Sequence, residues 1–463
     1  MKYAVAIIGA GPGGYVAAIR MAQLKMNVAL IEERDLGGVC LNRGCVPTKA
    51  LYSTTKLIER AESARSMGIS FASPNVDLSA LAEWKNRVVS RLVSGVASLL
   101  KANKATVISA RATIAGEGKI DLSTGEIVEA ERIVLATGSS PIEIPGFSFD
   151  ESRIWSSDDA LALSEVPERL VVIGGGVIGL EIATIYNRLG SAVTILEMMP
   201  EILPGIDIDR RTLATLKLAL KEQGIDVHVN TAATSLEETG HGAVVHTKSG
   251  ETILADRILL AVGRRPNSAG IGLENVGIEP DRRGFIEVNE NLQTSAPGVY
   301  AIGDLVAGPM LAHRASNDAL VLAEHLAEGP NAAPGGRERV IPQAIFTDPE
   351  VASVGLSEAR AKQEGIDVIV GRFPYAALGK ALGMNEPDGF FQVVAEAGSH
   401  RLIGTQIIGV DASSLIAEAS IAVQNGLSLE AIADSVHAHP TLPEGLKEAA
   451  EAALGRAIHA VNR

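Results

Sequence analysis

The sequence predicts an α/β protein with two nested Rossmann-like dinucleotide-binding domains, followed by a C-terminal α+β domain. Three observations lead to this prediction. A strand–glycine turn–helix–strand pattern occurs at residues 4–33 and again at 169–198. Strand-like and helical segments alternate after residue 340. The chain has 463 residues, which is more than a single hydrophobic core usually organises.

Composition sets limits on what the protein does. The formal charge of −14 argues against a nucleic-acid partner, because neutralising phosphates requires clustered Lys and Arg. Two cysteines in so long a chain suggest a reducing compartment, where a thiol pair is more often catalytic than structural, so we expect a cytoplasmic protein. The apolar run after Lys2 is too short for a signal peptide, and no run is long enough for a membrane span.

The first βαβ unit comprises a strand over 4–11, a helix over 11–25 and a strand over 27–33. Its turn reads G-x-G-x-x-G at Gly9, Gly11 and Gly14, the pattern that brings backbone close to a pyrophosphate at a helix N-terminus. Glu32 ends the second strand, where a carboxylate can accept hydrogen bonds from a ribose diol. The glycine pattern alone is weak, but the strand, helix and terminal acid together make a chance match improbable.

The second unit repeats this arrangement with strands over 169–176 and 192–198 around a helix over 177–190. Its glycines are Gly174, Gly176 and Gly179, and its terminal acid is Glu197, at the same interval as in the first unit. An acid at this position favours NAD over NADP, because it would repel a 2′-phosphate. Two methionines follow Glu197, and no Arg or Lys is near.

Further along, residues 131–141 and 256–266 resemble each other, each a strand that ends in glycine and a turn. Residues 299–305 are a third apolar strand, and the Gly/Pro-rich stretch 328–340 marks a boundary. Strands over 352–356, 390–396 and 402–409 and helices over 415–426 and 445–460 follow. We therefore expect four segments with these bounds: 1–143, 144–264, 265–335 and 336–463.

Cys40 and Cys45 follow the first unit in the sequence GGVCLNRGCVPTK. On an incipient helix this spacing can bring two cysteines within disulfide range, and a helix N-terminus lowers a thiol pKa. Two ordinary buried cysteines are the alternative that the spacing leaves open.

The cysteine motif resembles the active-site signature of the class I pyridine nucleotide-disulfide oxidoreductases. Further motifs of that family occur in its order: ATG at 136–138, GRRPN at 263–267, AIGD at 301–304, MLAH at 310–313 and HAHPTLPE at 437–444. The resemblance covers nearly the whole chain. It is greatest to the members that oxidise protein-bound dihydrolipoamide to lipoamide and reduce NAD+ to NADH.

The resemblance implies one non-covalent FAD per subunit, held by segments 1–143 and 265–335, and NAD held by 144–264. Implied FAD contacts are Gly9, Gly11, Gly13, Gly14, Glu32, Lys49, Ala112, Thr137, Gly138, Ser139, Asp304, Met310, Leu311, Ala312 and His313. Implied NAD contacts are Gly174, Gly176, Gly179, Glu181, Glu197 and Gly263. We expect Lys49 to lie near the flavin and to pair with Glu181. No metal is expected.

The same resemblance implies that Cys40 and Cys45 form the redox disulfide and that His439, held by Glu444, is the base. It makes 336–463 a dimerisation domain and places His439 against the cysteines of the other subunit of a homodimer. A cis peptide before Pro440 fits this motif, and His437 is expected to be structural.

The implied partner is a lipoyl-bearing acyltransferase (E2) or the H protein of the glycine-cleavage system. Alternatives are a related NAD(P)H-dependent disulfide reductase, a mercuric reductase, or a non-catalytic assembly component. Glu197 argues against NADPH, and the chain lacks a C-terminal cysteine pair. Two positions depart from the family pattern, Gln392 for an expected lysine and 317–319 for Glu-Glu-Gly, and the segment 374–389 is expected at the substrate channel or the dimer edge.

Overall fold

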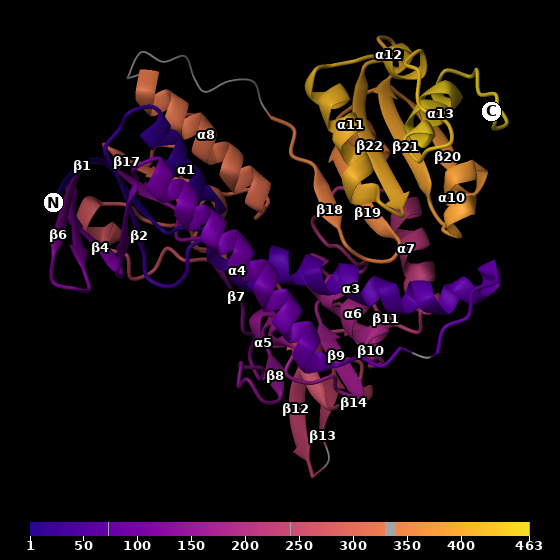
Figure 1. Ribbon diagram of the computed structural model, residues 1–463, viewed down its shortest axis with the longest axis horizontal. Coiled ribbons are helices and arrows are strands. Elements are labelled where there is room, and N and C mark those ends of the chain that lie inside the picture. Colours follow the sequence, from indigo (N-terminus) through magenta and orange to yellow (C-terminus); the bar gives the residue numbers. More distant parts are fainter. Residues whose placement is uncertain (73, 241, 329–338, 463) are drawn as a thin grey trace.

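The computed structural model describes residues 1–72, 74–240, 242–328 and 339–462. The chain forms three bodies, each with a sheet and its own helices, and the α/β class is confirmed (Figure 1). The predicted boundary between 335 and 336 lies outside the described residues.

The first body contains a seven-stranded sheet in the order β3-β2-β1-β6-β5-β4, with β17 also paired to β6. Strands β1, β2, β3, β6 and β17 run parallel where they pair, and Val5–Ile8 of β1 are buried on both faces. This burial explains why the sequence shows a continuous apolar run. The bounds are β1 Lys2–Ile8, β2 Val28–Glu32, β3 Thr106–Ser109, β4 Ala112–Gly116, β5 Lys119–Leu122, β6 Ile127–Leu135 and β17 Val299–Ala301.

Helices from both ends of the first body pack together. Helix α1 (Pro12–Gln23) lies against α8 (Ala312–Glu328), although some 300 residues separate them, and Figure 1 shows the two side by side. Two long helices, α3 (Cys45–Ser63) and α4 (Leu78–Ala102), extend from this body across the second. Short elements complete it, namely α2 Gly38–Arg43, η1 Ala64–Met67, η2 Leu273–Val276 and η3 Gly303–Leu305.

The second body has a five-stranded parallel sheet in the order β11-β10-β9-β15-β8. A three-stranded antiparallel sheet, β12-β13-β14, projects from it and was not predicted. The strands are β8 Ile154–Trp155, β9 Arg169–Ile173, β10 Ala192–Leu196, β11 Asp226–His228, β12 Ala233–Thr239, β13 Gly242–Thr247, β14 Thr252–Ala255 and β15 Arg257–Leu260. The helices are α5 Ser157–Ala162, α6 Val177–Arg188 and α7 Arg210–Glu222.

The chain enters and leaves the second body through one ribbon. Strand β7 (Ser139–Pro141) pairs antiparallel with β16 (Arg264–Pro266), so that Pro141 faces Arg264. The second body is therefore inserted into the first, because β17, which completes the first sheet, comes after β16.

The third body has a five-stranded antiparallel sheet in the order β18-β19-β22-β21-β20. Its strands are β18 Gln343–Ile345, β19 Glu350–Gly355, β20 Val368–Pro374, β21 Phe390–Glu396 and β22 Leu402–Gly409. Its helices are α9 Glu358–Gln363, η4 Tyr375–Ala377, α10 Gly379–Met384, α11 Ala412–Gln424, α12 Leu429–Ala433 and α13 Glu444–Ala453. The helix predicted over 445–460 ends early, because Gly455 adopts a left-handed conformation that stops it.

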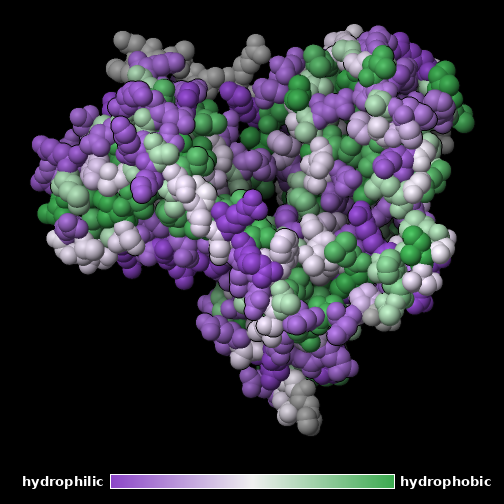
Figure 2. Space-filling view, viewed as in Figure 1, coloured by the Kyte–Doolittle hydropathy of each residue, from purple (hydrophilic) through white to green (hydrophobic). Residues whose placement is uncertain are grey.

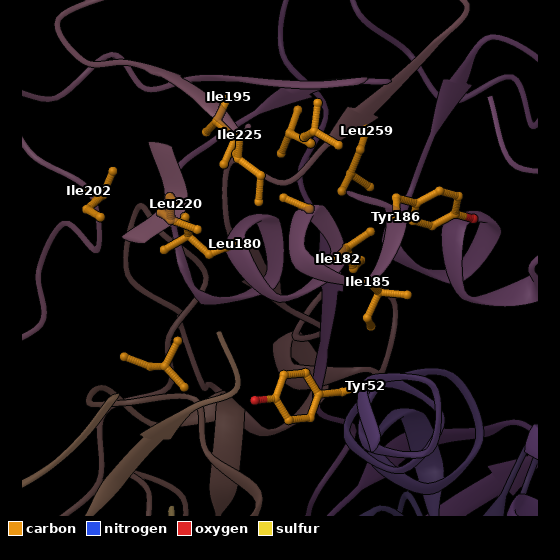
Figure 3. Close-up of a cluster of buried hydrophobic side chains, with 14 of the residues drawn as sticks. Tyr52, Leu180, Ile182, Ile185, Tyr186, Ile195, Ile202, Leu220, Ile225 and Leu259 are labelled. Atoms are coloured by element: carbon orange, nitrogen blue, oxygen red, sulfur yellow. The ribbon is translucent and has the colours of Figure 1, made fainter. Parts of the chain in front are cut away.

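One hydrophobic cluster joins all three bodies. Tyr52 of α3 lies below Ile182 and Ile185 of α6 (Figure 3), and Ile345 of β18 and Val351 of β19 belong to the same cluster. Between the body with α1 and α8 and the body with α11, the space-filling view shows a hollow (Figure 2). The three bodies thus pack against one another around helices α3 and α6.

Candidate active site

The first glycine turn joins β1 to α1. Gly9 has a positive φ of 100°, and a Cβ at Gly14 would lie 1.8 Å from the carbonyl oxygen of Gly9. Only glycine allows this close packing of helix on strand. Gly11 faces open space, and no side chain caps the N-terminus of α1, so backbone N–H groups are available for a phosphate. A Cβ at Gly13 would lie 3.2 Å from Ile302 Cδ1 and 3.4 Å from the Ala315 carbonyl oxygen, so this side of Gly13 packs against the protein.

Glu32 is held beside this turn. Its carboxylate accepts hydrogen bonds from the N–H of Ala10 at 2.6 Å and of Arg34 at 2.8 Å. The residue after β3 also contacts Glu32, because the N–H of Ala110 donates to the Glu32 carbonyl. Ala112 lies just beyond, at the start of β4, with its side chain buried. The predicted contact at Ala112 is therefore restricted to its backbone.

The second glycine turn has the same construction. A Cβ at Gly179 would lie 2.1 Å from the Gly174 carbonyl oxygen, whereas Gly176 faces open space. Glu197 is 4% exposed and accepts from the N–H of Gly175 at 2.8 Å and of Met199 at 2.7 Å. Both units therefore present an open glycine next to a fixed carboxylate, which fits a dinucleotide in each.

The turn after β11 also reaches Glu197 and was missed. The backbone N–H of Glu197 donates to His228, and the N–H of Thr231 donates to the Glu197 carbonyl, both at 2.8 Å. The carboxyl end of β11 was the signal that could have indicated this turn, because ligands of parallel sheets bind at the carboxyl ends of the strands.

Cys40 and Cys45 stand on two successive helices. Cys40 is in α2 and Cys45 is the first residue of α3, with Gly44 between the helices. A Cβ at Gly38 would lie 2.6 Å from Cα of Gly11, so this segment packs directly on the first glycine turn. Both cysteines are free, Cys40 partly buried and Cys45 exposed.

The electrostatic surroundings separate the two thiols. A hydrogen bond from Cys40 and the Lys49 charge together lower the pKa of the Cys45 thiol to about 7, against burial and the Glu181 charge, which raise it. The same hydrogen bond and burial raise the pKa of Cys40. Cys45 is therefore the thiolate of the pair, as expected for a thiol at a helix N-terminus beside a lysine.

Lys49 connects the first body to the second. Its Nζ lies 2.9 and 2.8 Å from the two carboxylate oxygens of Glu181, so the predicted pairing is confirmed. The Nζ is also 4.4 Å from the centre of the Phe346 ring, and the N–H of Phe346 donates to Glu181 at 3.1 Å. Three bodies therefore meet at Glu181, which is 4% exposed.

The ribbon β7–β16 brings together several predicted residues. Ser139 Oγ donates to Asp304 at 2.6 Å, and Thr137 Oγ1 donates to the Asn267 carbonyl at 2.8 Å. The N–H of Asn267 donates to the carbonyl of Gly138. Sequence reasoning missed Arg264, whose Nε donates to Ser139 Oγ at 2.8 Å. Burial lowers the pKa of Arg264.

The remaining predicted contacts line the edges of this region. Gly263 precedes β16, and its carbonyl accepts from the N–H of Ile142. Met310 and Leu311 lead into α8, which begins at Ala312, and all three are partly buried. His313 is exposed and lies 2.7 Å from the Pro342 carbonyl, so its ring turns toward the third body.

The other catalytic candidates lie at the start of α13. His439 Nδ1 is 2.9 Å from Glu444 Oε1, while Glu444 Oε2 accepts from the N–H of Thr441 at 2.7 Å. The peptide before Pro440 is cis, as expected. Burial raises the pKa of Glu444, but hydrogen bonds from Thr441 and His439 outweigh this and lower it. His437 bonds instead to Glu418 and to the Ser435 carbonyl, in keeping with a structural role.

A hollow of about 570 Å³ lies between α3 and α4, lined by Val46, Lys49, Ala50, Ser53, Thr54, Leu57, Trp84 and Val88. It begins next to Cys45, because Val46 is the following residue. Most of its wall is apolar.

Gln392 and Asp318, at positions that depart from the family pattern, are buried and paired. Gln392 is fully buried, accepts from Arg372 Nε and donates to Asp209. Asp318 accepts from the N–H of Gly303 at 3.1 Å. In the segment 374–389, Glu386 lies 3.2 Å from Lys56 of α3, so this segment packs against the helix that carries Cys45.

Within the described parts of the chain, no three His, Cys, Asp or Glu side chains gather to hold a metal ion. None of the helices described there combines the length and apolar character required to cross a bilayer.

Comparisons with known proteins agree with this geometry. Residues 3–319 match the model of the family "Pyridine nucleotide-disulphide oxidoreductase", and residues 341–450 match its dimerisation domain. The chain is 46% identical to a dihydrolipoyl dehydrogenase of Geobacillus stearothermophilus, over 99% of this chain and 97% of that protein. It is 44% identical to one of Haloferax volcanii, with the same coverage.

Two solved structures are similar along almost the whole chain. LpdA from Mycobacterium tuberculosis has a TM-score of 0.89 and 27% identity, covering 97% of this chain and 99% of that one. The HOCl-induced flavoprotein disulfide reductase RclA from Escherichia coli has a TM-score of 0.87, with the same identity and coverage.

Proposed function

The chain belongs to the pyridine nucleotide-disulphide oxidoreductase family, and we propose that Cys40 and Cys45 are its redox pair. The protein oxidises dihydrolipoamide to lipoamide and reduces NAD+ to NADH, with FAD and NAD as cofactors. One observation carries the assignment of the cysteines. Cys45 lies one helical turn before Lys49, and Lys49 binds Glu181 of the second dinucleotide unit, so the thiol stands between the two units.

The cofactor sites are assigned within this proposal to segments 1–143 and 265–335 for FAD and to 144–264 for NAD. The open glycines Gly11 and Gly176 and the fixed carboxylates of Glu32 and Glu197 fit a dinucleotide in each unit. FAD bound there would supply the two-electron chemistry that connects the reduced cysteine pair with NAD+. Ser139 and Asp304 would hold the flavin-bearing end of FAD.

The chain's own residues carry out the thiol–disulfide exchange. His439 takes a proton from the substrate dithiol, and the thiolate formed attacks Cys40 Sγ of the Cys40–Cys45 disulfide. The S–S bond breaks, and Cys45 leaves as a thiolate, which its lowered pKa favours. The second substrate sulfur, once deprotonated, displaces Cys40 and closes the cyclic disulfide. The substrate loses two electrons and the cysteine pair gains them.

The substrate approaches the cysteines along the hollow between α3 and α4. This hollow starts beside Cys45, and its walls from Ala50 to Trp84 are mostly apolar, as suits the hydrocarbon part of a lipoyl arm. The amide end of the arm can meet the hydroxyls of Ser53 and Thr54.

The protein is a homodimer through its C-terminal dimerisation domain. We infer that His439 serves the cysteines of the other subunit. Its side chain is 78% exposed, and within the described residues its only hydrogen-bond partner is Glu444. A base so placed is free to face a second chain.

The partner that delivers the lipoyl group is, in this proposal, an acyltransferase core or a glycine-cleavage H protein in the cytoplasm. The cysteine content and the bacterial and archaeal relatives support this location. Co-purification with one of these carriers tests the partner directly.

Two serine variants test the cysteine assignment. Cys45→Ser should abolish the long-wavelength absorbance that a thiolate next to oxidised flavin gives in the two-electron-reduced enzyme. Cys40→Ser should show this band without any reduction, because its remaining Cys45 thiolate has no disulfide partner. Persistence of the band in Cys45→Ser would mean that the two roles are reversed. An assay of NADH formation from dihydrolipoamide and NAD+ with the unaltered enzyme tests the activity independently.

A further inference from the structure

Helices α3 and α6 are linked at two sites. Lys49 binds Glu181 at the first site. At the second, Arg188 Nη2 of α6 lies 2.9 Å from the Glu59 carboxylate of α3, which also lies 2.9 Å from Lys56 Nζ of the same helix. The second link lies ten residues beyond Lys49 on α3 and seven residues beyond Glu181 on α6, about 15 and 10 Å along the two helix axes. Two links at this separation fix both the rotation and the sliding of one helix along the other.

The segment 346–348 of the third body touches both links. Phe346 donates its N–H to Glu181, and the Thr347 carbonyl accepts from the Tyr52 hydroxyl at 2.8 Å. The Asp348 carboxylate lies 2.6 Å from Lys56 Nζ and also binds Arg188 Nη2. Residues 346–348 therefore contact both links and the stretch of α3 between them.

The second link is a closed cluster of charges. Lys56 and Asp348 are both 8% exposed, and the Arg188 side chain is 5% exposed and lies over the Tyr52 ring at 4.8 Å. Glu386 completes the cluster from the segment 374–389, at 3.2 Å from Lys56. Buried charges hold their geometry because each loses stabilisation when its partner moves.

We propose that Asp348, with Lys56 and Arg188, is a positioning centre that sets the place of Lys49 beside Glu181 and so beside the Cys45 thiol. None of the three is part of the proposed redox or cofactor machinery. They act through α3, whose first residue is Cys45 and whose second turn carries Lys49. The inference rests on the proposed function only in taking Cys45 as the thiolate next to the flavin.

The physical basis is the distance dependence of the Lys49 charge. This charge lowers the pKa of Cys45, and Glu181 raises it. Cys45 and Lys49 are both on α3, so a shift of α3 against α6 changes the distance of each from Glu181. A Lys49 side chain that Glu181 no longer holds can then move away from the thiol, where its charge acts more weakly. Loss of the second link should therefore change the pKa of the Cys45 thiol, although Lys49 itself is still present.

The test is a pH titration of the long-wavelength absorbance in the two-electron-reduced holoenzyme, whose midpoint reports the Cys45 thiol. Asp348→Asn removes the charge that holds Lys56 and Arg188. We expect the midpoint to rise by about half to one pH unit, a three- to tenfold loss of thiolate at a fixed pH below the midpoint. Asp256→Asn, which breaks the ion pair with Arg169 elsewhere in the second body, is the matched control and should leave the midpoint unchanged.

A double variant decides whether Asp348 acts through Lys49. In a Lys49→Met background, Asp348→Asn should cause no further shift of the midpoint. Equal shifts with and without Lys49 would overturn the proposal. Should Asp348→Asn fold poorly, Glu59→Gln removes one negative charge from the same cluster and should give a smaller shift in the same direction. An absent band in the unaltered enzyme would instead contradict the assignment of Cys45.

Discussion

The ammonium group of Lys49 lies within 3 Å of both carboxylate oxygens of Glu181, a residue 132 positions further along the chain. This contact joins the helix that begins with Cys45 to the helix of the second glycine turn. The electrostatics of the thiol and the contact between the two dinucleotide units therefore depend on the same pair.

Replacing Lys49 by Met should raise the pKa of the Cys45 thiol, which is now about 7. The cation that favours the thiolate is lost, and the Glu181 charge that disfavours it is no longer balanced. The thiolate exists above the pKa and is lost as the pH falls through it, so the substitution moves this loss to higher pH. The midpoint of the long-wavelength absorbance measures it. Lys25→Met, at an exposed site, is the control.

Replacing His439 by Gln should slow dihydrolipoamide oxidation by about two to four decades, because glutamine cannot take a proton from the dithiol. Reduction of a dye by NADH should continue, since it does not require that base. His437→Gln is the matched control, because His437 bonds to Glu418 rather than to Glu444. Equal losses in the two variants would remove His439 from the mechanism.

Replacing Gly14 by Ala should weaken the retention of FAD. The added methyl would lie 1.8 Å from the Gly9 carbonyl oxygen, so α1 must move away from β1, at a cost of about 1–3 kcal/mol. The ratio of flavin to protein absorbance after gel filtration measures retention. Gly95→Ala, in α4 with no atom within 4 Å, should retain FAD fully and gain about 0.5–1 kcal/mol of stability. Full retention in Gly14→Ala would contradict the assignment of this turn.

Replacing Glu197 by Gln should raise the KM for NAD+ by about ten- to a hundredfold, with a smaller effect on kcat. The carboxylate accepts two backbone N–H groups, and an amide can accept only one of them well, so the loop moves and the ribose loses its acceptor. Glu201→Gln, which disturbs the pair with Lys217 and a hydrogen bond from the Ile202 N–H, should leave the KM unchanged.

Sequence patterns predicted the parts of the fold that depend on local chemistry. Both glycine turns and their terminal acids were located because a close helix–strand contact requires glycine. The strands at 390–396 and 402–409 were predicted with the observed bounds, since apolar residues predominate in both. The hairpins β12–β13–β14 were missed because β12 has no buried residue and so no apolar alternation.

The family resemblance implied the contact between Lys49 and Glu181, but other contacts between distant segments left no signal in the sequence. Lys56 and Asp348 are separated by 292 residues, and neither belongs to a recognisable motif. Arg264 lies within a motif that was recognised, yet nothing in the motif indicates that its side chain reaches Ser139. Only the pairing of β7 with β16 brings these two side chains together.

The insertion of the second body has a consequence for synthesis on the ribosome. The five-stranded parallel sheet of that body is complete once β15 has been made, at Leu260. The first sheet still lacks β17, which ends at Ala301, and α1 lacks the helix α8 that covers it. Although its first strand leaves the ribosome earlier, the N-terminal body is thus the later of the two to acquire all its strands. In the nascent chain, residues 133–135 of β6 therefore stay without their partner strand β17 until the inserted body has been made.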